Sequence, residues 1–109
     1  MRLEVIWSPE AVSDLEGIIE YLQNENPTVA AQMAEKILSA CDKLENLPQR
    51  GRHVPEMDAM LQQNIREIAL FPWRVVYEIL DAHLHILMVV DGRRDMQSLL
   101  VNLSLRTKN

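Results

Sequence analysis

The segment from Ile65 to Asp95 constrains the fold most, because it is rich in β-branched, aromatic and aliphatic residues and has only two breaks. Phe71-Pro72 is the first break, since proline cannot donate a hydrogen bond to a strand ladder. Residues 81–83, Asp-Ala-His, are the second. Short apolar runs bounded by turn residues predict consecutive antiparallel strands. We expect three of them, at residues 64–70, 73–80 and 84–90.

Two helix starts precede this segment, each marked by a capping residue followed by proline. Ser8-Pro9 and Asn26-Pro27 both place a good N-cap before a residue suited to the first helical position. Apolar residues recur at helical spacing after each start, so both helices are predicted to be amphipathic. The first should end near Asn24 and the second near Leu47-Pro48. Because so few residues separate the helices, they are expected to form an αα-hairpin.

Residues 2–7 alternate between apolar and polar side chains, which is typical of a strand with one buried face. The predicted order is β-α-α-β-β-β, a helical hairpin packed on one face of a small antiparallel sheet, which is an α+β fold. We expect a single domain over residues 1–109, with an apolar tail at 96–109. Residues 50–60 are predicted to form a loop.

Composition excludes several classes of protein. We expect neither membrane insertion nor export, because no apolar run approaches the roughly 20 residues that span a bilayer and no signal-peptide core is present. A lone cysteine, Cys41, cannot form an internal disulfide, which fits a reducing, cytoplasmic location. There is no glycine-rich phosphate loop, and His83 and His85 lack a third ligand nearby. We therefore expect no cofactor and no metal site.

The net charge of −5 is unevenly distributed along the chain. Residues 1–47 carry three cations against nine anions, whereas residues 48–109 carry eight cations, seven of them arginine, against seven anions. An acidic chain is a poor candidate for strong direct nucleic-acid binding, because phosphate contacts dominate that affinity. The choice of arginine over lysine in the second half favours paired or planar recognition contacts.

Arginines in or beside the apolar strands are the main candidates for function. Alternation places Arg74 on the sheet face opposite Trp73, and Arg66 on the neighbouring strand is expected to share the face of Arg74. With Arg93 and Arg94 they would form a cationic cluster suited to a phosphodiester or a carboxylate-rich partner. The alternative is that the cations only tie the strands together. Their partners would then be neighbouring carboxylates, namely Glu67, Glu78 and Asp95.

Short motifs occur in order along nearly the whole chain. They are W-S-P-E-A at 7–11, D-L-x-x-I-x-x-Y-L at 14–22, N-P-x-x-A at 26–30, L-x-x-x-P-x-x-G-R at 44–52, R-E at 66–67, W-R-V-V-Y at 73–77 and D-G-R-R-D at 91–95. In this order they resemble the RelE/ParE superfamily of type II toxins, and more closely its ParE branch. The resemblance implies the same β-α-α-β-β-β fold and a toxin silenced by a co-encoded antitoxin. ParE-like members poison DNA gyrase, whereas RelE-like members are ribosome-dependent mRNA endonucleases.

The residues favour the gyrase poison over the nuclease, and hence a protein that is not an enzyme. RNA cleavage needs a base, an acid and cations, and RelE-like toxins place lysines on the middle strands and a tyrosine or histidine near the C-terminus. This chain has no lysine between Lys43 and Lys108, and no tyrosine or histidine after His85. A non-toxic binding module on the same scaffold is a further alternative. If the chain is a nuclease, its catalytic residues would be Arg74, Arg93, Arg94, His85 and Glu67.

The expected partners are a cognate antitoxin, DNA gyrase and a second copy of the chain. Sheet residues, strand-end arginines and the apolar tail are the predicted contacts, since a small domain rarely exposes such apolar surface without a partner. The predicted binding residues are Arg66, Trp73, Arg74, Tyr77, Arg93, Arg94, Leu99, Leu100 and Leu103.

Overall fold

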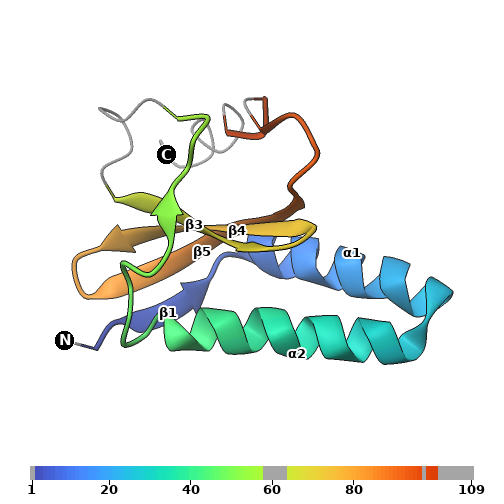
Figure 1. Cartoon of the computed structure of the whole chain (residues 1–109). Helices are drawn as coiled ribbons and strands as arrows, with labels where there is room; N and C mark the ends of the chain where they lie inside the picture. Colours follow the sequence, from blue (N-terminus) through green and yellow to red (C-terminus); the bar gives the residue numbers. More distant parts are fainter. Residues whose placement is uncertain (1, 58–63, 97, 101–109) are drawn as a thin grey trace.

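Two antiparallel helices cover one face of a five-stranded sheet in the computed structural model, which describes residues 2–57, 64–96 and 98–100 (Figure 1). The helices are α1 (Pro9–Glu25) and α2 (Pro27–Lys43). The strands are β1 (Glu4–Trp7), β2 (Arg52–His53), β3 (Ile65–Leu70), β4 (Trp73–Leu80) and β5 (His83–Asp91), in the sheet order β1-β5-β4-β3-β2. This arrangement confirms the predicted α+β fold of a helical hairpin on a sheet.

The sheet is mixed rather than purely antiparallel. Strand β1 runs parallel to β5, with Val5 opposite Leu84, whereas β2, β3, β4 and β5 pair in antiparallel fashion. A parallel neighbour requires a long crossover connection, and the chain between β1 and β5 provides one. The second difference is β2, a two-residue strand within the segment predicted to be a loop. It pairs with β3 through Arg52 opposite Glu67.

The two helix starts form as the sequence predicts. The Ser8 hydroxyl accepts a hydrogen bond from the Ala11 amide at 3.0 Å and donates one to the Leu87 carbonyl at 3.2 Å. The Asn26 side chain accepts from the Thr28 amide at 3.0 Å. Both caps satisfy amide groups that the first helical turn leaves free. The Ser8 cap also fixes the start of α1 to β5.

Apolar side chains pack on both faces of the sheet. The core beneath the helices contains Leu3, Ala11, Leu15, Ile37, Cys41, Leu44, Trp73, Val75, Tyr77, Leu84, Ile86 and Val89. The core on the other face contains Val54, Val76, Leu87, Met88, Val90, Met96 and Leu100. Trp73 therefore faces the helices and Arg74 the opposite side, as the alternation predicts. Burial raises the pKa of Cys41 to about 12, so this thiol is a core residue rather than a nucleophile.

Candidate functional site

The four arginines predicted to form a cationic cluster at one end of the sheet, Arg66, Arg74, Arg93 and Arg94, do not share one network. Arg74 is instead the centre of an ion-pair network with no net charge, on the sheet face opposite the helices, which we call the second face. The Arg74 guanidinium forms two hydrogen bonds with the Glu56 carboxylate, at 2.9 Å from Nη1 and 2.7 Å from Nη2. Its Nε lies 2.7 Å from one oxygen of Glu67, whose other oxygen accepts from Arg52 Nε at 2.7 Å. Two arginines and two glutamates cancel in charge, so the network offers no net attraction for a phosphate.

Burial limits what this network can bind. Glu67 is 1% exposed and Arg74 is 8% exposed, so both charges require partners inside the protein. The hydrogen bond to Glu56 raises the pKa of Arg74, and the same bond lowers the pKa of Glu56. The alternative in which arginines only tie the strands together therefore applies to Arg74, because its partner Glu67 lies on the neighbouring strand β3.

Tyr77 fastens the segment after α2 onto the sheet. Its side chain is fully buried, and its hydroxyl donates to the Pro48 carbonyl at 2.7 Å and accepts from the Gly51 amide at 2.9 Å. Burial raises the pKa of Tyr77. A Cβ on Gly51 would lie 2.5 Å from the Glu67 carbonyl and 2.6 Å from the Tyr77 hydroxyl, so a side chain does not fit there. Residues of the motifs at 44–52, 66–67 and 73–77 are therefore in contact with one another. We call the hydrogen bonds that join Tyr77 to Pro48 and Gly51 the clamp.

Arg66 lies on the opposite face of the sheet from Arg74, so the prediction that the two share a face is wrong. The tight turn between β3 and β4 places Arg66 opposite Tyr77, which faces the helices. The Arg66 Nη1 donates to the Gly51 carbonyl at 2.8 Å and so supports the same clamp. Turn length fixes this register, so the sequence contained the information needed to place Arg66.

Arg93 and Arg94 lie just beyond the end of β5 and are exposed. Arg93 binds Asp91 through two hydrogen bonds, of 2.5 Å from Nη2 and 2.8 Å from Nε, and these bonds hold the pKa of Asp91 at about 2. The guanidinium of Arg94 has no hydrogen bond or ion pair within the described part of the chain. Both arginines border a groove between α1 and the ends of β4 and β5, which we call the α1–β5 groove. Its lining includes Gly17, Tyr21, Trp73, Asp91, Arg93 and Arg94.

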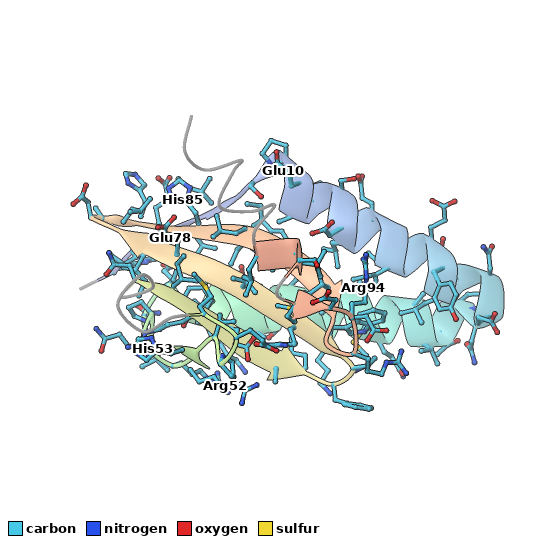
Figure 2. The ribbon with its side chains drawn as sticks, turned by 90° about the horizontal axis from the view of Figure 1, so that it is seen from above. Glu10, Arg52, His53, Glu78, His85 and Arg94 are labelled. Atoms are coloured by element: carbon cyan, nitrogen blue, oxygen red, sulfur yellow. The ribbon has the colours of Figure 1, made fainter. Side chains whose placement is uncertain are left out.

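The residues of the nuclease alternative do not converge. His85 lies opposite Glu78 near the β4–β5 turn, and Figure 2 shows both well away from Arg94, which lies beside α1. Glu67 is enclosed by its two arginine partners on the second face of the sheet. The residues named for the nuclease alternative therefore do not surround one common point at which a phosphate could bind.

Several predicted binding residues belong to the protein's own core. Trp73 is 9% exposed, and Leu100 is 8% exposed and packs with Met88 on the second face. Leu99 is partly buried against the same core, and Leu103 lies outside the described residues. The described start of the tail thus covers the sheet of its own chain.

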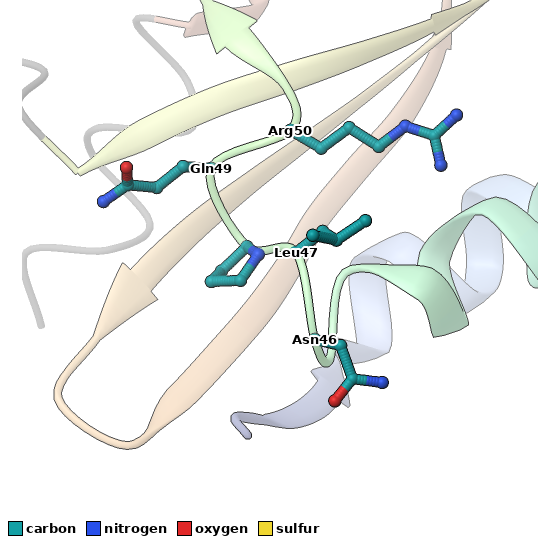
Figure 3. A pocket seen from close by; sticks show the side chains of 5 residues that line it. Asn46, Leu47, Gln49 and Arg50 are labelled. Carbon is teal, nitrogen blue, oxygen red and sulfur yellow. The ribbon is translucent and has the colours of Figure 1, made fainter. Parts of the chain in front are cut away.

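Other surface features carry little chemistry. A shallow hollow after α2 is lined by consecutive residues, Asn46 to Arg50, with Gln49 and Arg50 pointing to opposite sides (Figure 3). The described residues contain no group of three or more histidine, cysteine, aspartate or glutamate side chains placed to hold a metal ion. No described helix combines the length and the apolar character that crossing a membrane requires.

Comparison with known proteins identifies the family. The family model described as the ParE toxin of the type II toxin-antitoxin system parDE matches residues 5–96. Toxin RelE2 of Caulobacter vibrioides (strain ATCC 19089 / CIP 103742 / CB 15) is 30% identical over 92 residues, which cover 84% of this chain and 97% of that protein. A solved structure described as the chromosomal ParDE TA system from P. aeruginosa matches with a TM-score of 0.68 at 18% identity, over 83% of this chain and 96% of that one. The last match supports the fold alone.

The chain belongs to the ParE toxin family of type II toxin-antitoxin systems. This result confirms the superfamily that the ordered motifs predict. The names of the relatives come from both branches, since the family model is called ParE and the Caulobacter relative RelE2.

Proposed function

We propose that this protein is a toxin that poisons DNA gyrase and is neutralised by a cognate antitoxin. Family membership supplies the class of toxin, and the description of that family, the ParE toxin of the type II toxin-antitoxin system parDE, supports an antitoxin partner. The choice of gyrase over mRNA rests on one observation, which is that the Arg74 guanidinium is already occupied by Glu56 and Glu67.

The occupied guanidinium matters because cleavage of a phosphodiester needs cations that are free to stabilise the developing negative charge. Arg74 is the strand arginine among the residues predicted for the nuclease, but three of its nitrogens donate to carboxylates of the same chain. The net charge of −5 also disfavours binding to the phosphate-rich ribosome. A toxin that grips a protein target needs neither a free phosphate-binding cation nor a proton-transfer pair.

The second candidate function is ribosome-dependent mRNA cleavage. It is favoured by the name of the Caulobacter relative, Toxin RelE2. A partly exposed histidine, His85, stands opposite Glu78 and would be the acid or base of such a reaction.

Controlled expression in a host that lacks the antitoxin separates these functions. We expect growth arrest with a DNA-damage response while translation continues. Early translation arrest with mRNA cut at the ribosome would support the nuclease instead, provided that His85→Ala abolishes both effects. Full growth at every expression level would point to the non-toxic binding module. Arg74→Ala is unsuitable here, because the buried Glu67 carboxylate would keep only Arg52 as a partner. The Arg52 side chain is largely exposed, so the loss of Arg74 would disturb the fold.

A further inference from the structure

Arg74 has two carboxylate partners of different kinds. Glu67 lies on the neighbouring strand β3, its side chain is fully buried, and one of its oxygens accepts from Arg74 Nε at 2.7 Å. Glu56 comes from the irregular segment after β2, and its side chain is 31% exposed. The buried charge of Arg74 therefore has one partner within the sheet, and Glu56 is an additional partner on the solvent side.

Glu56 covers the end of the Arg74 guanidinium. Its two oxygens accept from Arg74 Nη1 at 2.9 Å and from Nη2 at 2.7 Å. This two-point geometry is the one in which arginine binds carboxylates and phosphates alike. A phosphodiester carries the same single negative charge and also offers two oxygens, so it would fit the guanidinium end that Glu56 occupies.

The fold holds Glu56 in this position. Val54, two residues earlier, is fully buried in the core of the second face, and the Met57 amide donates to the Val54 carbonyl at 3.1 Å. Glu56 thus lies within a turn that begins at a buried residue. The turn limits where the Glu56 side chain can reach, and it reaches Arg74.

The charges around this position would attract an anion if Glu56 were removed. Arg52 donates to the second oxygen of Glu67 through Nε at 2.7 Å, and its positive charge also lowers the pKa of Glu56, so Arg52 lies close to the same carboxylate. In the wild type, Glu56 and Glu67 balance Arg52 and Arg74. Without Glu56, two arginines would face one glutamate, which leaves a net positive charge and an unoccupied guanidinium end.

We infer that Glu56 is a specificity-determining residue that keeps the phosphodiesters of nucleic acids away from Arg74. Its carboxylate takes the place that a backbone phosphate would take, so the wild-type network is closed to nucleic acid. A chain that is closed to nucleic acid stays free to reach a protein partner. The inference goes beyond the proposed function, because it concerns the purified chain alone and holds whichever protein the toxin acts on.

Removal of the Glu56 carboxylate tests the inference through a gain of binding. Purified full-length wild type and Glu56→Ala are titrated against a short, fluorescein-labelled single-stranded DNA at low salt, and fluorescence anisotropy measures the affinity. We expect Glu56→Ala to bind about tenfold more tightly than the wild type. One added phosphate contact should also steepen the dependence of log affinity on log salt concentration by about 0.7.

Two control variants show whether the gain comes from Arg74. Glu78→Ala removes the same charge from strand β4, at a position well away from Arg52 (Figure 2), and should change the affinity by less than about twofold because only the net charge differs. Glu56→Ala combined with Arg74→Lys keeps a cation beside Glu67 but removes the planar fork of the guanidinium. This double variant should lose most of the gain.

Circular dichroism establishes that each variant is folded, and Glu56→Gln carries the test if Glu56→Ala is not. Glutamine keeps the length of the side chain and removes its charge, so the affinity should rise by a smaller factor. Wild-type affinity in the folded variant would overturn the inference. An equal gain in Glu78→Ala, or a gain that survives Arg74→Lys, would overturn it as well.

A carboxylate-rich probe separates the two anions that a guanidinium binds. If an acidic peptide binds Glu56→Ala and the oligonucleotide does not, the site selects carboxylates and the inference is wrong. These assays contain neither gyrase nor ribosomes, so their outcome is separate from that of the proposed function.

Discussion

Replacing Glu67 by glutamine keeps the shape of the side chain and removes the charge at the centre of the arginine network. In the wild type, one Glu67 oxygen accepts from Arg74 and the other from Arg52, each at 2.7 Å. Glutamine accepts from one guanidinium only, and its NH₂ group then faces the other, donor against donor. Arg74 keeps its bond to Glu56, and the side chain of Arg52 is 62% exposed and can turn toward water.

The expected loss of stability follows from the burial of the two bonds. A buried charge-assisted hydrogen bond contributes about 1.5–3 kcal/mol, and an exposed ion pair contributes about 0–1 kcal/mol. Glu67→Gln should therefore lower the free energy of unfolding by about 1.5–4 kcal/mol. For a chain of this size that corresponds to a fall of about 7–20 °C in the melting temperature.

Urea denaturation followed by tryptophan fluorescence measures this loss. Glu78→Gln is the matched control, because Glu78 is a glutamate of the neighbouring strand β4 and forms no ion pair with the described residues. We expect the control to change stability by less than about 0.5 kcal/mol. Equal stability of the Glu67→Gln and Glu78→Gln variants would refute the structural role of the network.

Two further predictions concern the clamp and the network. Tyr77→Phe should cost about 2–3 kcal/mol, because it leaves the Pro48 carbonyl and the Gly51 amide without their hydrogen bond; denaturation would measure the cost, and faster exchange of the Gly51 amide would locate it. Glu56 has a folded-state pKa below its usual value of 4.5, so its contribution to stability is complete above that value and is lost as the pH falls through the folded pKa. Urea midpoints should therefore stay level from neutral pH to about 5 and fall in more acidic buffer, less steeply in Glu56→Gln. A midpoint that falls equally steeply in wild type and variant would contradict this assignment.

Periodicity and capping chemistry predict the elements of the fold well. The cap-then-proline pairs at Ser8 and Asn26 fix both helix starts, since only a few residue types satisfy the free amides of a first turn. Alternation along β4 places Trp73 and Arg74 on opposite faces. The parallel pairing of β1 with β5 is not predictable in this way, because it depends on how distant segments pack.

The candidate site is harder to predict than the fold. Whether a strand arginine is free or paired depends on long-range contacts, and Glu56 reaches Arg74 from an irregular segment that has no periodicity to interpret. The placement of Arg66 opposite Tyr77 follows from the tight β3–β4 turn. The sequence therefore contained the information needed, and the prediction that Arg66 and Arg74 share a face used the wrong strand register.

The motif residues therefore divide into two groups with different tasks. Gly51, Arg52, Glu67, Arg74 and Tyr77 hold the segment after α2 on the sheet. Arg93, Arg94 and Tyr21 remain at the surface around the α1–β5 groove. Variants of the first group should change stability, whereas variants of the second should change recognition with little effect on stability.

Gyrase assays with purified components test the proposed function most directly. Toxin freed of its antitoxin is added to gyrase, relaxed plasmid and ATP, and the products are treated with detergent and protease. We predict a dose-dependent loss of supercoiling with accumulation of linear, gyrase-cleaved plasmid, both reversed when the antitoxin is added back. Unchanged supercoiling, with the same preparation cutting mRNA on purified ribosomes, would contradict the proposal.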